Sequence, residues 1–341
     1  LFFLMIRRPP RSTLFPYTTL IRSDNSVRDA AEAQLDKMRA ENILNVITQF
    51  FTVLQSNVSS SLKAFIAVIL RKVIDSKAWE KLNADERTQV KNFLLQIFQA
   101  EGESRVRRAV CDVISQISIL DEEWNGLYEF IMSACSQPND VCIEGMYLLG
   151  EVGYNNGGLV QENMQAIVQM LSSALQSSTL PVRVAASRAV MKIMTLEVDE
   201  IVSTFAAALP AVVATVQAVL SAGDEDSLLS LLEDLDSCVE VACSYLHEHL
   251  PTIVEMCLAI CSNSDYPSGV RSLAADIIAV MAEENGGFFR KHGAYLQQYL
   301  QIAANMMMDI DEDANWESGV FGEEEELVES DSVPHVMGCE I

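Results

Sequence analysis

Hydrophobic and polar residues alternate along most of the chain with the period of an α-helix. Five segments share one pattern, in which a Val is followed by apolar or small residues three, four, seven, eight and eleven positions later. Residues with this spacing lie on one face of an α-helix. The pattern therefore predicts five amphipathic helices, whose first apolar residues are Val27, Val106, Val141, Val182 and Val270.

The pattern repeats along the chain. Two weaker copies begin near Leu62 and Ser227, and the seven starts are then 35 to 45 residues apart. A second amphipathic stretch lies between starts, for example at Ile43–Leu54, Gln89–Phe98 and Ile167–Leu175, so each unit is predicted to be a helical hairpin. One hairpin buries too little apolar surface to offset its loss of conformational entropy, whereas stacked hairpins share a continuous core. We therefore expect an all-α fold, a HEAT-repeat α-solenoid of about seven to eight repeats.

Two features refine this prediction. A polar residue precedes a proline at Thr179 and Asp265, ahead of Pro181 and Pro267, which predicts a capped helix start with proline in the first turn. An Arg follows the Val at Arg28, Arg107, Arg183 and Arg271, and an Asp lies six residues after it at Asp112 and Asp276. We expect Arg and Asp of adjacent repeats to pair across the stack; contact with a ligand is the alternative.

The two ends of the chain differ from the repeats. Residues 1–23 contain four Arg, three Pro and no acidic residue, and their order does not fit a secretory signal. A transit peptide fits the composition, but the stretch resembles translated sequencing-adapter sequence, so we expect a non-native leader. We assign residues 24–308 to the repeats, 309–331 to an acidic loop and 332–341 to the start of a further helix. The chain is therefore expected to be a fragment.

The composition excludes several classes of protein. The 341 residues include 23 Lys and Arg and 48 Asp and Glu, for a net charge of −25, and half of them are apolar. Such a chain is too apolar to be disordered throughout and too acidic to bind nucleic acid. The longest apolar run, Phe205–Ala222, is interrupted by Pro210 and Gln217, so no membrane span is predicted. Eight Cys without close pairing are typical of reduced thiols.

The segment from 309 to 331 contains eleven acidic residues and no basic one. An EF-hand loop needs Gly at its sixth position and Glu at its twelfth, where this chain has Ala314 and Val320. Two alternatives stay open: a solvated loop, and a docking strip for a basic partner, whose association the field would accelerate. Trp316 is an aromatic anchor that favours the docking strip.

No catalytic or metal site is predicted. Cys238, Cys243, His247, His249, Cys257 and Cys261 cluster within 24 residues, but they lack the close ligand pairs of a zinc site. His247 and His249 do not have the spacing of a metalloprotease motif, and the glycines near Gly153 lack a P-loop Lys. We therefore expect no cofactor, no metal and no enzymatic activity.

The repeats and the acidic segment together resemble the N-terminal third of importin-β-type nuclear transport receptors. The resemblance lies in VRDAAEAQLDKM, in LKAFIAVILRKVI with Trp79 after it, in SRVRRAVCDVISQI, and in DEDANW at Asp311–Trp316. It covers residues 24–341, without the first helix of the family's first repeat. Another HEAT scaffold, such as a phosphatase regulatory subunit, is the alternative, and it would lack the acidic loop.

The resemblance implies a receptor that shuttles between cytoplasm and nucleus and binds the GTP form of Ran, basic cargo and Phe-Gly nucleoporins. It implies that Val27–Met38, Leu62–Val73 and Val106–Ile117 face Ran. Ran or basic cargo would contact Asp309, Asp311, Glu312, Asp313 and Trp316. Met164, Ile167 and Leu171 are candidate walls of a nucleoporin pocket, with packing in the core as the alternative.

Overall fold

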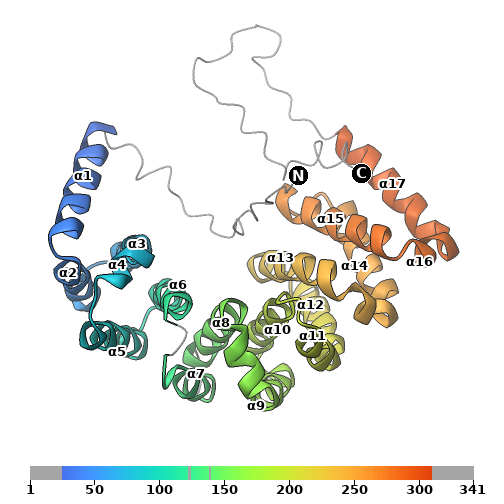
Figure 1. Cartoon of the computed structure of the whole chain (residues 1–341). Coiled ribbons are helices and arrows are strands. Elements are labelled where there is room, and N and C mark those ends of the chain that lie inside the picture. Colours follow the sequence, from blue (N-terminus) through green and yellow to red (C-terminus); the bar gives the residue numbers. More distant parts are fainter. Residues whose placement is uncertain (1–24, 122–123, 138–139, 309–341) are drawn as a thin grey trace, which may run out of the picture. The chain divides into compact units, whose positions relative to one another are not determined.

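The computed structural model describes residues 25–121, 124–137 and 140–308, and every regular element in these ranges is helical. This confirms the all-α HEAT-repeat solenoid. The chain divides into two compact units, Leu1–Val113 and Ile114–Ile341, which we call unit 1 and unit 2. Figure 1 shows the helices of each unit. The acidic-loop residues, and the leader, lie outside the described residues.

The described residues of unit 1, 25–113, form five helices and most of a sixth. Helix α2 packs against α1, α3 and α5. Their bounds are α1 Asn25–Glu41, α2 Ile43–Gln55, α3 Ser60–Val73, α4 Ser76–Glu80, α5 Ala84–Ala100 and α6 Ser104–Leu120, which continues into unit 2.

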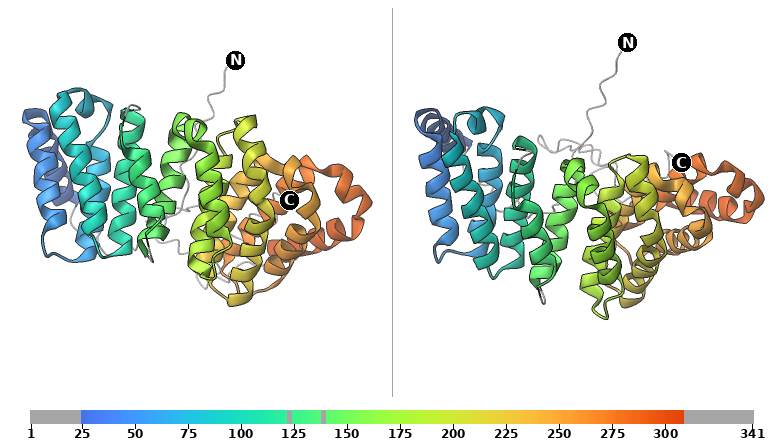
Figure 2. Two further views of the ribbon diagram at one scale, coloured as in Figure 1. Left: turned by 90° about the horizontal axis from the view of Figure 1, so that it is seen from below. Right: turned by 60° about the horizontal axis from the view of Figure 1, so that its bottom comes forward.

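Unit 2 consists of hairpins whose helices form two layers. Helices α8, α10, α13 and α15 contact one another in that order, and each packs on the helix that precedes it in its hairpin. Helices α8 and α10 lie side by side in Figure 1, and Figure 2 shows the helices from two further sides. The bounds are α7 Leu127–Cys135, α8 Asp140–Asn155, α9 Gly157–Leu175, α10 Leu180–Met194, α11 Asp199–Phe205, α12 Leu209–Ala222, α13 Glu225–Ala242, α14 Leu250–Ser262, α15 Ser268–Glu284, α16 Gly286–Lys291 and α17 Gly293–Met307, with short 3-10 turns at Ala206–Ala208 and Cys243–His249.

Several helices start earlier than their apolar pattern predicts. Helix α5 starts five residues before Gln89 because Asn83 and Glu86 form a capping box. Helix α9 starts ten residues before Ile167, since Asn156 accepts a hydrogen bond from Leu159 N at 3.1 Å and caps it. Caps, rather than the apolar stripe, therefore set these boundaries.

The two proline starts differ from each other. Pro181 lies in the first turn of α10 after the N-cap residue Thr179, although the Thr179 side chain makes no capping hydrogen bond. Pro267 is itself the N-cap residue of α15, so the prediction of Pro267 inside the first turn is wrong. The φ angle of about −65° that the proline ring imposes fits both a first-turn and an N-cap position.

The stretch Asp199–Ala222 has the length and apolar composition of a membrane-spanning helix. In the structure it is interrupted by the turn at Ala206–Ala208, and α12 packs against α10 and α13. Its apolar residues Leu209, Val212, Val216 and Val219 are buried in the core of unit 2. Burial inside the helical stack therefore accounts for the apolar composition of Asp199–Ala222.

The expected pairing of the Val-following arginines across the stack is wrong for Arg107, and Arg271 makes the same kind of contact with a backbone carbonyl. Arg107 Nε donates to Phe98 O and Arg271 Nε donates to Cys261 O, each at 3.3 Å. These carbonyls lie near the end of the preceding helix, where backbone acceptors lack intrahelical partners. Such an arginine therefore joins the two helices of one hairpin. Asp112 does pair with a neighbouring repeat, through Arg71 Nη1 at 3.7 Å.

Candidate partner-binding surfaces

Three surfaces emerge from the described residues. The predicted acidic-loop residues Asp309, Asp311, Glu312, Asp313 and Trp316 lie outside the described part of the chain, so their roles stay predictions. The remaining predictions concern α3, α6 and α9, whose side chains the structure places.

Helix α9 directs its predicted pocket residues inward. Ile167 and Leu171 have exposed fractions of 0% and 1%, and Met164 is half-buried. The Asn156 cap fixes the start of the helix, and the spacing of four residues then places Ile167, Leu171 and Leu175 on one buried face. Ile167 and Leu171 thus pack in the core, which is the alternative weighed for them above.

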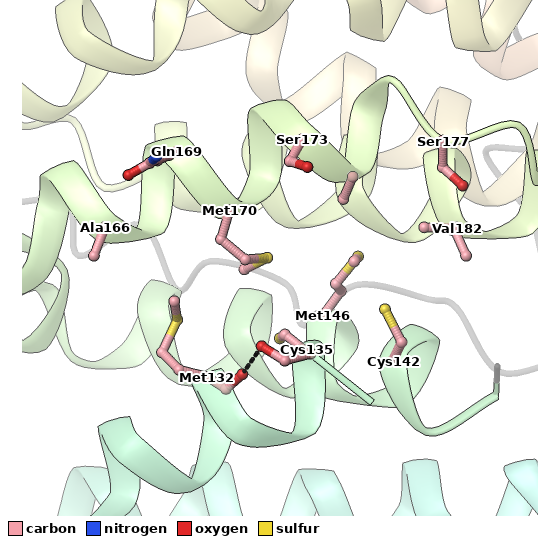
Figure 3. A pocket seen from close by; sticks show the side chains of 12 residues that line it. Met132, Cys135, Cys142, Met146, Ala166, Gln169, Met170, Ser173, Ser177 and Val182 are labelled. Atoms are coloured by element: carbon pink, nitrogen blue, oxygen red, sulfur yellow. Dashed lines mark hydrogen bonds between the residues drawn. The ribbon is translucent and has the colours of Figure 1, made fainter. Parts of the chain in front are cut away.

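The neighbouring face of α9 borders a groove that sequence analysis missed. Figure 3 shows this groove between α9 on one side and α7 with the start of α8 on the other. Its volume is about 650 Å³. The sulfur-bearing side chains lie around its centre, and the lining consists of Met132, Cys135, Ser136, Cys142, Met146, Ala166, Gln169, Met170, Ser173, Ala174, Ser177 and Val182. We call it the sulfur-lined groove.

Close packing of two helices holds one side of the groove in place. A Cβ atom on Gly145 of α8 would lie 2.8 Å from Cys135 N and 2.9 Å from Ala134 C. Only glycine allows α8 to approach the backbone of α7 so closely. At the end of α7, Ser136 Oγ donates to Met132 O at 2.8 Å, as drawn in Figure 3. These contacts fix the positions of Met132 and Met146.

The sulfur-lined groove is electrically neutral. None of its lining residues is Asp, Glu, Lys or Arg. Burial raises the pKa of the Cys135 thiol to about 12 and also raises the pKa of Cys142, so both remain protonated at neutral pH. Methionine side chains are flexible and polarisable, and they adapt to aromatic groups. The groove can therefore take an apolar or aromatic side chain of an uncharged peptide.

The layer formed by α8, α10, α13 and α15 is the second surface, and it is strongly acidic. These four helices contain 12 acidic and 4 basic residues. Arg188 Nε pairs with Asp234 Oδ2 at 2.5 Å, and Lys192 Nζ pairs with Glu151 Oε1. The positive charges of Arg188 and Lys192 are thus neutralised within the layer, and the excess of carboxylates remains.

Two carboxyl groups in this layer are crowded. Burial, together with the nearby carboxylates of Asp276 and Glu240, raises the pKa of Asp236 to about 7. The Asp236 Oδ1 atom is buried and accepts no hydrogen bond. Burial also raises the pKa of Glu233, although Arg188 opposes the shift. A cation brought to this layer would relieve the repulsion.

Helices α3 and α6, which the resemblance assigns to Ran, form the third surface. Leu62 and Phe65 of α3 have exposed fractions of 42% and 43%, although both are apolar. Arg71 and Lys72 at the end of α3 are exposed as well. On α6 the exposed cations are Arg105 and Arg108. This surface combines apolar and cationic side chains, which is typical of protein-binding sites.

Three cysteines of the Cys- and His-rich stretch between Cys238 and Cys261 lie in the core. Cys238, Cys257 and Cys261 have exposed fractions of 1% or less, and burial raises the pKa of each thiol. Cys261 Sγ donates to Arg271 O at 3.3 Å. Among the described residues, no three His, Cys, Asp or Glu side chains are placed to hold a metal ion.

Comparisons with known proteins agree with this architecture. The family model "IPO5-like, TPR repeats" matches residues 102–256, and the model "Importin repeat" matches residues 263–337. The stretch FFRKHGAYLQQYLQIAANMMMD, residues 288–309, resembles importin-5 (karyopherin beta-three), and both models agree with this resemblance. Importin subunit beta-3 of Saccharomyces cerevisiae is 22% identical over 325 residues, which are 89% of this chain and 30% of that protein. The chain thus spans about a third of the relative it matches.

Solved structures of Kap121p have the same fold. The structure of Kap121p alone matches with a TM-score of 0.69 at 20% identity, over 94% of this chain and 31% of that one. Kap121p bound to RanGTP matches with a TM-score of 0.69 at 20% identity, over 93% and 30%. Kap121p bound to Nup53p matches with a TM-score of 0.67 at 21% identity, over 94% and 32%.

Proposed function

Because the chain belongs to the importin-β family, we propose that it forms part of a nuclear import receptor. In this proposal it binds GTP-loaded Ran and basic cargo, contacts Phe-Gly nucleoporins, and shuttles between cytoplasm and nucleus. Two importin models that match consecutive stretches of one helical-repeat chain are the observation that carries the proposal. The proposed activity is binding, without catalysis.

Ran is proposed to bind the exposed face of α3 and α6. A related receptor, Kap121p, has been solved bound to RanGTP. Leu62 and Phe65 expose apolar area that an intramolecular contact would normally cover, and Arg105 and Arg108 add positive charge. Aromatic and arginine side chains of this kind carry much of the binding free energy at protein interfaces.

Basic cargo is proposed to bind the acidic layer and the acidic segment. The α8, α10, α13 and α15 layer has three times as many acidic as basic residues. The predicted contacts Asp309, Asp311, Glu312, Asp313 and Trp316 would extend this negative field. Charge of one sign accelerates association with an oppositely charged partner, and salt weakens the effect.

Nucleoporins are proposed to bind the sulfur-lined groove, beside the face of α9 that was predicted from the sequence. Kap121p has been solved bound to Nup53p. The groove is neutral within an acidic unit, so it favours uncharged segments, and its methionines suit a phenylalanine ring. Met164 is half-buried on the same helix, whereas Ile167 and Leu171 would support the groove from within the core.

A nucleotide-dependent pull-down tests the proposal. The chain is incubated with immobilised Ran loaded with GTP or with GDP, at low and at moderate salt. We expect retention on the GTP form, which Phe65→Ala weakens and Tyr154→Ala, a change at another exposed aromatic residue, leaves unaltered. Equal retention on both forms of Ran contradicts the receptor proposal and favours another HEAT-repeat scaffold.

A further inference from the structure

Positive charge is unevenly distributed along this acidic chain. Residues 25–113 contain 13 Lys and Arg and 11 Asp and Glu, whereas residues 114–308 contain 6 and 24. Charges separated by more than a Debye length, about 8 Å in physiological salt, are largely screened from each other. The potential at a site on unit 1 is therefore set mainly by the side chains close to it.

Unit 1 contains a pocket with several of these cations. The pocket lies between the last turns of α1 and the short helix α4, and its volume is about 300 Å³. Its cations are Arg39 of α1 and Lys77 and Lys81, within and just after α4. Asp36 and Asp75 are its carboxylates, and Ala40 and Ala78 complete the lining. We call it the cationic pocket.

Asp75 is already committed to partners inside the protein. As the N-cap residue of α4, it accepts a hydrogen bond from Ala78 N through Oδ1 at 2.8 Å. Its Oδ2 atom pairs with Arg39 Nη2 at 2.5 Å. The hydrogen bond from Arg39 lowers the pKa of Asp75, so this carboxyl is ionised at neutral pH. Asp75 therefore holds Arg39 in place across the pocket.

The lysines, in contrast, are available to a ligand. Lys77 and Lys81 are exposed, and neither forms an ion pair among the residues that the structure describes. Arg39 uses one N–H group on Asp75, and a guanidinium has four further N–H donors. Two ammonium groups and these donors thus converge on one small cavity.

From this arrangement we propose that the cationic pocket binds an acidic peptide segment of a partner protein. Carboxylate side chains would pair with Lys77, Lys81 and the open side of Arg39. The pocket is at the lower end of the size range of ligand sites, so it accommodates a few side chains. A nucleic acid would require a continuous cationic stripe, whereas 11 acidic residues are distributed among the cations of residues 25–113. The proposal does not depend on binding of Ran or basic cargo.

Fluorescence anisotropy with the full chain tests this proposal. The probe is a labelled peptide of about ten Asp and Glu residues, titrated at low and at physiological ionic strength. We expect binding that weakens with salt, and a loss of affinity of about tenfold in Lys77→Glu/Lys81→Glu. Lys77→Ala/Lys81→Ala should lose less, because it removes the attraction without adding repulsion.

The matched control is Arg290→Glu/Lys291→Glu, which changes the net charge by the same amount at two exposed basic residues of α16 outside the pocket. It should retain the affinity of the original chain within about twofold. Equal losses in the two Glu variants, or binding that salt does not weaken, would overturn the proposal. Circular dichroism of each variant verifies that the helices are retained.

Discussion

The pKa values of carboxyl groups are shifted downward in unit 1 at Asp75 and Glu101 and upward in unit 2 at Asp236 and Glu233. In unit 1, hydrogen bonding to Arg39 lowers the pKa of Asp75. Burial raises the pKa of Glu101, but hydrogen bonds from Glu103 N, Lys63 and Gly102 N outweigh it, and the net shift is downward. In unit 2, burial raises the pKa of Asp236 to about 7 and also raises that of Glu233.

The opposite pKa shifts show that carboxylates stabilise the folded state in one unit and destabilise it in the other. In unit 1, Asp75 and Glu101 are paired with Arg39 and Lys63, so these carboxylates stabilise the folded state at neutral pH. Unit 2 retains carboxylates that repel one another, which costs stability and is relieved by a bound cation. Repelling carboxylates are expected where a basic partner binds, and the comparison therefore supports the placement of basic cargo on unit 2.

The largest effect is expected from Arg188→Met, which removes the main cation of the acidic layer. Asp234 would lose its partner at 2.5 Å, and Glu233 would lose a nearby positive charge. The free energy of unfolding in urea should fall by about 3 kcal/mol, since an unpaired buried charge remains. The double variant Arg188→Met/Asp234→Leu should recover part of this loss. If the double variant recovers none of the lost free energy of unfolding, the loss arises from packing. That result would contradict the comparison of carboxylates in the two units.

A gain in stability is expected from Asp236→Asn. The folded-state pKa of Asp236, about 7, lies above its ordinary value of 3.8, so the native state loses stability as pH rises from about 4 to about 7 and regains none above that range. The variant should be more stable by about 2 kcal/mol at pH 8, and the gain should disappear below about pH 4. Denaturation at several pH values measures this. Glu162→Gln, at an exposed residue of α9, is the control, and a pH-independent gain would contradict the explanation.

The neutrality of the sulfur-lined groove can be tested by adding a charge. Met170→Asp should weaken binding of an uncharged Phe-Gly peptide about tenfold, because the carboxylate must lose solvent when the peptide binds. Gln165→Asp adds the same charge on the exposed side of α9 and should have little effect. Isothermal titration calorimetry gives both affinities. Similar losses in the two variants would mean that net charge, and not the groove, governs binding.

The smallest effect is expected from Asp75→Asn in unit 1. Asn remains a good N-cap residue, so the variant removes the ion pair with Arg39 and retains the cap. The pKa of Asp75 is lowered, so the pair stabilises the protein above the unfolded-state pKa, near 3.9, and is lost as pH falls through the folded-state value. The loss at pH 7 should be below about 1 kcal/mol, as for exposed pairs. Thermal unfolding at pH 7 and at pH 3 measures this loss of stability. An equal loss at both pH values would contradict a contribution of the Asp75–Arg39 ion pair.

The sequence was sufficient to predict the helices, because their apolar stripes repeat with a fixed phase. Val106, Val113, Ile117, Val270 and Ile277 are all buried, as their spacing predicts. Helix starts were predicted less well, because a cap such as Asn156 lies outside the apolar stripe. A proline also fits more than one position near a helix start, as Pro181 and Pro267 show.

The surfaces could be predicted only in part. Met132 and Met170 are far apart in sequence and line one groove, one side of which is held by the close packing of α7 and α8 at Gly145. The cationic pocket similarly combines Arg39 with Lys77 from another helix. Contacts of this kind depend on tertiary packing, which no local pattern specifies. The raised pKa of Asp236 likewise depends on Asp276 in the next hairpin.

The arginine-to-carbonyl hydrogen bonds within two of the hairpins have a consequence for evolution. Arg107 and Arg271 bond to carbonyls of their own hairpin, so these bonds need no particular neighbour. A gene duplication or deletion that adds or removes a whole hairpin would leave such bonds intact in every remaining copy. The length of the array could then change by whole modules, while contacts such as Arg188–Asp234 would have to be rebuilt at each new junction.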